Sequence, residues 1–302
     1  MPDLPCSTCH RRAVVYQRYS GLHLCKTHFF ADFEAKAKRA IRSHRWIVTG
    51  DRIGIFLDSG VSGNALLYFL KRLAGNRRDL ELLAITIDEG RGGCQAPPAP
   101  ADPDPTRGPG VVHISVSFRE MFGLTMDEIV RLRGDPAACS CRDVLRRRCF
   151  TTLAREYGMT KIALASTLDD EAGAVLMAMI RGEAARLLWP PATFEGCIPR
   201  ISPFRYIPAQ EVALYATLQT GEAGDAQQRS PCTALEADLP TLLDEYTGHH
   251  PSAKYALVNI GDSIASFSSL PDPAVAACPS CGEPCITGCE GCRMVEELLH
   301  DR

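Results

Sequence analysis

Cysteines in closely spaced pairs are the residues of this chain most suited to chemistry. Near the N-terminus they follow the spacing Cys6-x2-Cys9-x15-Cys25-x2-His28. Two short hooks that each supply two ligands, joined by a loop of hairpin length, are typical of a structural zinc site with three cysteines and one histidine. Four protein ligands close such a site, so we expect it to stabilise the fold and not to bind a substrate. Chance placement of these residues is the less favoured interpretation.

A second set of cysteines near the C-terminus has the spacing of a four-cysteine zinc ribbon, Cys278-x2-Cys281-x7-Cys289-x2-Cys292. Cys285 lies inside this set as a spare thiol that could replace a neighbour. The chain has 14 cysteines in 302 residues. It shows no secretory leader pattern and no apolar run long enough to span a membrane, which favours metal binding in a reducing compartment over disulfides. The sequence therefore predicts two zinc ions in a cytoplasmic protein.

The stretch LDSGVSGNALLYFL, residues 57–70, has the layout of a phosphate-binding loop. An apolar strand runs into a Ser/Gly turn and then into an apolar helix, and in such loops backbone N–H groups and the helix N-terminus hold phosphates. The Walker lysine and the G-x-G-x-x-G pattern are both absent. A loop of this kind without the lysine resembles the PP-loop of ATP pyrophosphatases, usually Ser-Gly-Gly-x-Asp-Ser. The candidate nucleotide-binding residues of the loop are Leu57, Asp58, Ser59, Gly60, Val61, Ser62 and Gly63.

Strands alternate with helices along the middle of the chain. The predicted strands cover residues 52–57, 80–88, 110–117 and 161–166, and the predicted helices cover residues 64–74, 145–158 and 169–182. This alternation predicts an α/β fold with a doubly wound parallel sheet, in which ligands bind outside the carboxyl ends of the strands. The expected domains are an N-terminal zinc finger (1–30), a PP-loop ATP-binding domain (31–270) and a C-terminal zinc ribbon (271–302). The proline-rich tract at 95–110 is predicted to be a loop.

Several longer segments of the sequence resemble one enzyme family. They are AITIDEG (84–90), SFREMFGLTMDEIV (117–130), and the regions 144–183 and 198–216. With the two flanking cysteine sets, they resemble the tRNA 2-thiolation enzymes of the TtuA/TtcA type, and the cysteine sets match the TtuA-type branch. The resemblance covers nearly the whole chain. It implies an ATP-dependent tRNA sulfurtransferase that adenylates a uridine oxygen and replaces it with sulfur by way of a [4Fe–4S] cluster.

The resemblance also assigns roles to residues outside the loop. Asp88, Ser166, Asp169 and Asp170 join the ATP and Mg²⁺ site, although a pair of acids in a first helical turn is also favoured by the helix dipole alone.

For the iron–sulfur cluster, the resemblance assigns Cys139 as the first ligand and Cys232 as the third. The second expected position is occupied by Arg142, whereas Cys141 lies one residue earlier. Either Cys141 or Cys149 could take its place.

Two positions of the loop depart from the usual PP-loop pattern. Ser62 stands where the pattern has aspartate, and Gly63 stands where it has the final serine, while Asp58 lies nearby at the end of the strand. An alternative function is therefore a non-catalytic PP-loop paralogue that binds nucleotide or tRNA. A third is sulfur or redox chemistry on the same scaffold without ATP.

Two basic stretches are candidates for contact with tRNA phosphates. One contains Lys36, Lys38, Arg39, Arg42 and Arg45, and the other contains Arg142 and Arg146 to Arg148. Clusters of this kind in a chain of net charge −3 suit tRNA that is recognised by shape and backbone, although a solvated helix face is the simpler interpretation of either one alone. The other expected partners are a sulfur donor (sulfide or a ubiquitin-like sulfur-carrier protein) and a second copy of the chain, because dimers are common in the family.

Overall fold

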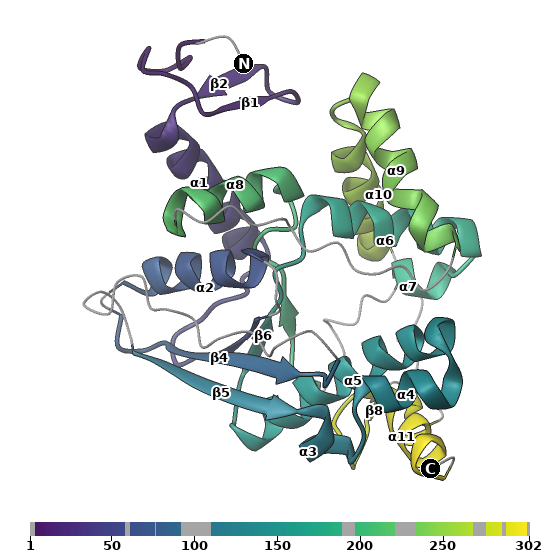
Figure 1. The fold of residues 1–302 in the computed structure, drawn as a ribbon. Coiled ribbons are helices and arrows are strands. Elements are labelled where there is room, and N and C mark those ends of the chain that lie inside the picture. The colour runs from purple at the N-terminus through teal and green to yellow at the C-terminus, as the bar shows by residue number, and fades with distance from the viewer. Residues whose placement is uncertain are drawn as a thin grey trace.

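A computed structural model describes residues 4–57, 61–75, 77–91, 110–188, 197–220, 234–267, 276–285 and 288–300. Figure 1 shows a central sheet with helices on both sides, and the two ends of the chain lie at opposite ends of the molecule. Within the described residues, no helix is both long and apolar enough to cross a membrane.

The central sheet contains five parallel strands. These strands are β3 (Arg52–Leu57), β4 (Glu81–Asp88), β5 (Val111–Ser117), β6 (Lys161–Ala163) and β7 (Arg200–Ile201). Their order across the sheet is β5-β4-β3-β6-β7, so the direction of winding reverses between β3 and β6. The predicted doubly wound sheet is confirmed. In such sheets the reversal point opens a crevice at the carboxyl ends of the strands, where ligands bind.

Successive side chains of each strand point to opposite faces of the sheet, and helices cover both faces. Ile53 and Ile55 of β3 point to one face, which is covered by α1 (Lys26–Ser43), α2 (Val61–Ala74) and α8 (Ala209–Thr220). Phe56 points to the other face, which is covered by α3 (Phe118–Phe122), α4 (Met126–Arg133), α5 (Asp135–Glu156) and α11 (Glu290–His300). A Cβ on Gly54 would lie 2.3 Å from the sulfur of Met159, so only glycine allows β3 to approach that close.

The remaining helices form a group beside the sheet. They are α6 (Leu168–Arg181), α7 (Ala184–Leu188), α9 (Ala234–His249) and α10 (Ala253–Phe267). Helix α6 begins with a capping box between Thr167 and Asp170 and ends at Gly182, which has φ 67°. It packs on α10 through a small buried cluster of Leu168, Ala172 and Val258.

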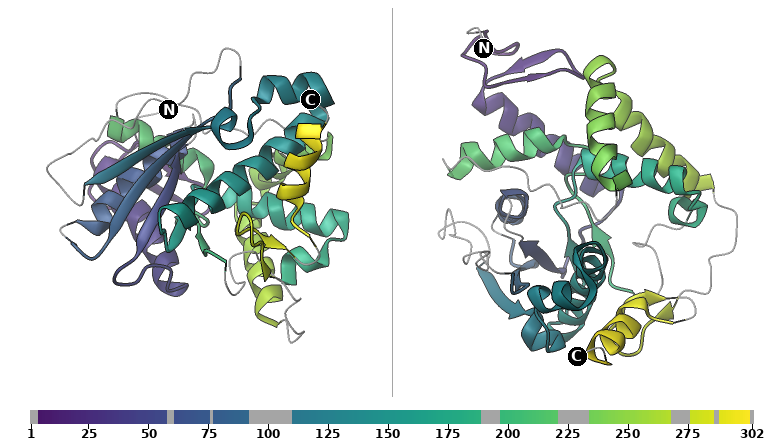
Figure 2. Two further views of the ribbon diagram at one scale, coloured as in Figure 1. Left: turned by 90° about the horizontal axis from the view of Figure 1, so that it is seen from below. Right: turned by 45° about the vertical axis from the view of Figure 1, so that its right-hand side comes forward.

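A small hairpin lies near each end of the chain. Strands β1 (Val15–Gln17) and β2 (Leu22–Leu24) pair antiparallel in the N-terminal knob, residues 4–30. Strands β8 (Ala276–Ala277) and β9 (Pro284–Cys285) pair antiparallel in the C-terminal knob, which comprises residues 276–285 and 288–300. Figure 2 shows the C-terminal knob beside α5.

Three predicted elements differ from the observed ones by more than one residue at an end. The helix predicted at 145–158 begins at Asp135, just after Gly134 with φ 75° and with a proline in its first turn, where proline is tolerated. The strand predicted to reach residue 166 ends at Ala163, which pairs with Ile55 of β3 and with Ile201, the last residue of β7. The helix predicted from residue 64 already includes Val61.

Candidate metal centres and nucleotide site

The N-terminal quartet brings together the four predicted ligands Cys6, Cys9, Cys25 and His28. Their ligand atoms all lie within 4.8 Å of one another. Cys25 is the N-cap residue of α1 and His28 lies in its first turn, so helix and hairpin together position the site. The Sγ atom of Cys6 is 3.4 Å from Nδ1 of His28, and the Sγ atoms of Cys9 and Cys25 are 3.6 Å apart.

These distances fit a tetrahedral zinc ion. With Zn–S bonds of about 2.3 Å and Zn–N bonds of about 2.0 Å, tetrahedral angles separate two sulfurs by about 3.8 Å, and a sulfur and a nitrogen by about 3.5 Å. Desolvation by burial opposes ionisation of Cys6, but backbone N–H groups, including that of Thr8, outweigh it and lower its pKa to about 5. The thiolate is the form that binds a metal.

The C-terminal quartet assembles in the same way from Cys278, Cys281, Cys289 and Cys292. Their sulfurs lie within 4.8 Å of one another, with Cys278 and Cys292 3.7 Å apart and Cys281 and Cys289 3.4 Å apart. The spare thiol of Cys285 points instead to the backbone oxygen of Ala276, at 3.6 Å. The quartet is therefore complete without Cys285.

Arginines of α5 attach the C-terminal knob to the body. Arg148 donates to the backbone oxygen of Gly291 at 3.0 Å, and Arg147 lies 3.6 Å from the carboxylate of Glu290. These arginines were predicted to contact RNA phosphates. Their intramolecular partners use part of their charge, and contact with RNA stays a prediction.

The attachment of the C-terminal knob also uses a partly buried carboxylate. Glu283 accepts from Arg200 at 2.7 Å and from the hydroxyl of Thr151. Thr151 and Glu283 are 132 positions apart. No local pattern in the sequence pairs residues at such a separation, so this contact could not be anticipated.

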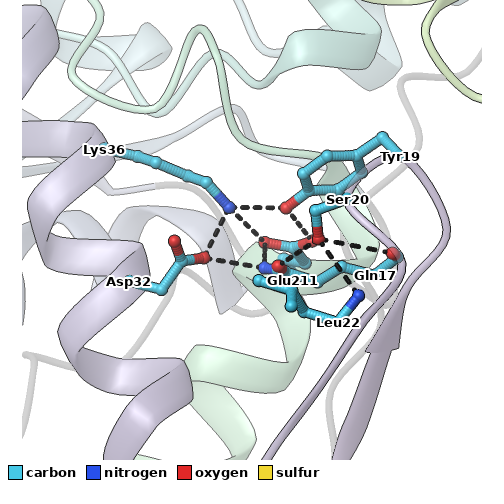
Figure 3. Close-up of polar contacts among 7 residues, drawn as sticks. All are labelled: Gln17, Tyr19, Ser20, Leu22, Asp32, Lys36 and Glu211. Atoms are coloured by element: carbon cyan, nitrogen blue, oxygen red, sulfur yellow. Dashed lines mark hydrogen bonds and ion pairs between the residues drawn. The ribbon is translucent and has the colours of Figure 1, made fainter. Parts of the chain in front are cut away.

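The N-terminal knob docks on α8 through the polar cluster of Figure 3. Glu211 of α8 accepts from the Tyr19 hydroxyl at 2.6 Å and from the Gln17 amide at 3.2 Å. Asp32 accepts from Gln17 at 2.7 Å and from Lys36 at 2.5 Å. Desolvation by burial raises the pKa of Tyr19, so Tyr19 stays protonated and donates. Lys36 was predicted to meet tRNA, but it is held within this cluster.

Two further contacts bear on the first basic stretch and on the N-terminal knob. Lys38, also predicted to meet tRNA, lies 3.1 Å from Glu34. Arg39, Arg42 and Arg45 are exposed on the surface. The knob also touches the end of α9, where Arg18 donates to the backbone oxygen of Gly248 at 2.6 Å; Figure 2 shows its hairpin reaching toward that helix.

Most predicted nucleotide-binding positions lie at the carboxyl edge of the sheet. Leu57 ends β3, and Val61, Ser62 and Gly63 form the first turn of α2. Asp58, Ser59 and Gly60 lie outside the described residues. Asp88 ends β4, and its carboxylate accepts from the backbone N–H of Gly90 at 2.8 Å.

Ser166 follows β6, which lies beside β3 across the reversal point. The loop after β3 and the loop after β6 therefore flank the crevice in which doubly wound sheets bind ligands.

The two aspartates of α6 have protein partners. Asp170 accepts from the backbone N–H of Thr167 at 2.8 Å and forms the capping box. Asp169 accepts from the backbone N–H of Ala209 at 2.7 Å and from Lys254 at 2.6 Å. These contacts cap helices and join α6 to α8 and α10. A role of either aspartate in holding Mg²⁺ stays a prediction.

The structure places the two described candidates for the second iron ligand, Cys141 and Cys149, in the core. Their role as iron ligands stays a prediction. Cys139 and Cys141 are two positions apart on helix α5. Cys141 is 6% exposed and packs in the core, where burial raises its pKa. Cys149 is fully buried, lies about 15 Å along the helix from Cys139, and has a pKa raised by burial to about 12. The side chain of Cys139 and all of Cys232 lie outside the described part of the chain.

Comparison with known proteins gives consistent similarities. Residues 6–30 match the model of the N-terminal LIM domain of the 2-thiouridine synthetase TtuA. The chain is 28% identical to the tRNA 2-thiolation protein NcsA of Haloferax volcanii, covering 98% of this chain and 99% of the relative. It is also 28% identical to the cytoplasmic tRNA 2-thiolation protein 1 of Xenopus laevis, covering 97% and 88%.

A solved structure extends the similarity to the fold. It is that of the U34-tRNA thiolase NcsA from Methanococcus maripaludis with its [4Fe–4S] cluster. It matches with a TM-score of 0.79 and 23% identity, and the alignment covers 99% of this chain and 97% of that one. The arrangement of sheet, helices and terminal knobs is therefore shared.

Proposed function

We propose that this chain is an ATP-dependent tRNA sulfurtransferase that makes 2-thiouridine. The proposal is supported by the match of residues 6–30 to the LIM domain of TtuA and by the similarity of nearly the whole chain to tRNA 2-thiolation proteins. The observation that carries the proposal is one architecture: a Ser/Gly loop at the reversal point of a doubly wound sheet, with a cysteine quartet in a knob at each end of the chain.

In the proposed reaction, the uridine oxygen attacks the α-phosphorus of ATP and pyrophosphate leaves. Backbone N–H groups at the start of α2 bind the phosphates, because they have no partners within the helix and carry the positive end of its dipole. Sulfur then attacks the activated carbon, and AMP leaves with the oxygen. A [4Fe–4S] cluster held by Cys139 and Cys232 would supply sulfide for this second step.

The altered loop changes how charge is neutralised during adenylation. Ser62 cannot supply the negative charge that an aspartate would offer to Mg²⁺. Asp88, which ends β4, and Asp58, which follows Leu57 in the sequence, are the carboxylates proposed to take that role. Backbone binding of phosphate does not depend on this exchange of side chains.

The remaining assignments complete the proposal. Each cysteine quartet holds a zinc ion that stabilises its knob, because the distances and donor atoms fit tetrahedral zinc. The sulfur donor is sulfide or a ubiquitin-like carrier protein. The protein acts in the cytoplasm, as the name of the Xenopus laevis relative suggests, and a homodimer is the proposed assembly.

The test is a turnover assay under anaerobic conditions. Protein reconstituted with iron and sulfide is mixed with ATP, Mg²⁺ and bulk tRNA, and AMP release and 2-thiouridine are measured. We expect both products to depend on tRNA and to be lost in the Cys139→Ala and Cys232→Ala variants. Cys285→Ala is the matched control, because this thiol lies outside both quartets, and it is expected to keep activity.

One result would reject this function. Wild-type protein that holds its zinc and binds tRNA, yet releases no AMP and forms no thiouridine, would be a non-catalytic binding paralogue. The replacement of the loop aspartate by Ser62 is the feature that makes this alternative worth testing.

A further inference from the structure

The Nε–H group of Arg142, on helix α5, makes no hydrogen bond with the described residues. The neighbouring arginines Arg146, Arg147 and Arg148 contact Glu89, Glu290 and the backbone oxygen of Gly291, respectively. Arg142 is only 8% exposed, and among the described residues its Nε atom has no hydrogen-bond partner. The adjacent carboxylate of Asp143 is 3.7 Å from Nε, beyond hydrogen-bond distance.

A buried guanidinium in this state is costly. Taking a charged group out of water destabilises the fold unless a counter-charge and hydrogen bonds replace its hydration. A guanidinium keeps its charge at every physiological pH, so it cannot lower the cost by losing a proton. Asp143 gives Nε a nearby counter-charge but no hydrogen bond. An anion that enters the site would supply the acceptor that Nε lacks.

The position of Arg142 in the fold places it on the ligand side of the sheet. The turn that follows α5 lies at the start of β3. In that turn, the backbone N–H of Thr160 donates to the backbone oxygen of Arg52, the first residue of β3, at 2.8 Å. Helix α5 therefore begins at the opposite, carboxyl edge, where Arg146 lies 3.4 Å from Glu89, the residue after β4. Arg142 is one turn closer to the helix start than Arg146, about 6 Å along the axis.

We propose that Arg142 binds a phosphate group of the substrate at this edge of the sheet. The planar fork of N–H donors in arginine matches the oxygen atoms of a phosphate. The identity of the ligand rests on the proposed function, whose two substrates, ATP and tRNA, both carry phosphates. The position is also the one at which the family resemblance implies an iron ligand, and a guanidinium has no lone pair to offer iron. Arg142 thus replaces a metal ligand by an anion-binding group.

The test compares binding by the full chain and its variants. Bulk tRNA and Mg-ATP are the probes, titrated separately against wild type, Arg142→Met and Arg142→Lys. Methionine fills the buried volume without charge, and such a replacement of a buried charge is often neutral or stabilising. The matched control is Arg131→Met, which removes an exposed arginine of α4.

In Arg142→Met we expect the dissociation constant for one probe to rise about ten-fold or more, with partial recovery in Arg142→Lys. A rise for tRNA, with a salt slope that is smaller by about 0.7 to 0.9, identifies a backbone phosphate. A rise for ATP identifies the nucleotide. Arg131→Met should change neither.

Unchanged binding of both probes by folded Arg142→Met would overturn the proposal and make Arg142 a purely structural residue. Arg142→Gln, which keeps a polar end, gives the same decision if the methionine variant does not fold. The assay reads binding and not turnover. A wild type that binds tRNA but forms no thiouridine would therefore remove the proposed function and leave the Arg142 site intact.

Discussion

Replacement of Glu211 by alanine should loosen the N-terminal knob. The carboxylate is 5% exposed and accepts from Tyr19 at 2.6 Å and from Gln17 at 3.2 Å (Figure 3). Gln17 keeps Asp32 as a second acceptor, whereas Tyr19 loses its buried acceptor. A lost hydrogen bond to a charged group costs about 1.5–3 kcal/mol. With the cavity left by the shortened side chain, we expect the free energy of unfolding to fall by roughly 2–4 kcal/mol.

Glu211→Gln separates the charge from the shape of this side chain. An amide oxygen can still accept from Tyr19, so we expect a loss of only about 1 kcal/mol. Desolvation by burial raises the pKa of Glu211. The stabilisation that follows from this raised pKa is therefore fully present below the ordinary pKa of glutamate. It is lost as the pH rises through the pKa of Glu211 in the folded protein. The difference in stability between wild type and Glu211→Gln should consequently shrink with rising pH across that window.

The assay combines urea denaturation at several pH values with hydrogen exchange of the β1 and β2 amides. The effect of Glu211→Ala should be greatest in this hairpin, because Tyr19 and Gln17 connect it to α8. Glu245→Ala, an exposed glutamate of α9, is the control. Equal hairpin protection and equal unfolding free energies in Glu211→Ala and wild type would refute the reasoning.

Three further predictions concern the other parts of the molecule. Glu283→Ala leaves Arg200 and Thr151 without their shared acceptor, so we expect the free energy of unfolding to fall by about 2–4 kcal/mol. The melting temperature should fall and zinc should leave the C-terminal quartet faster. An unchanged melting temperature would contradict this prediction. A strong chelator should abolish the protection of backbone amides from hydrogen exchange in the hairpins of both knobs, while the central sheet keeps its protection. The reason is that the quartets lie outside the main core. Simultaneous loss of protection in the sheet would show that the knobs and body unfold together. Ser62→Asp restores the carboxylate of the loop and should raise tRNA-dependent AMP release roughly ten-fold or more; a rate equal to or below that of wild type would mean that other carboxylates already do this work.

The metal centres and the order of the elements were accessible from the sequence alone. Both quartets assemble from the predicted residues, because the two ligands of each pair are three positions apart and local chain geometry sets their separation. Strand β3 has the predicted limits, residues 52–57, because a strand buried on both faces must be a continuous apolar run. The doubly wound sheet followed from the alternation of such strands with helices.

The tertiary structure decided which polar side chains remain available for chemistry. Asp169 turns to Lys254, Arg148 to Gly291, and Glu283 to Arg200. It also determined that α5 begins at Asp135, which places Cys139, Cys141 and Cys149 on one helix. These outcomes depend on partners between 83 and 143 positions away or on a helix limit without a strong local signal. A buried charge is balanced only by a partner that folding brings to it. The sequence specified the polar side chains, and the packing of the helices determined which of them kept hydrogen-bonding capacity for a ligand.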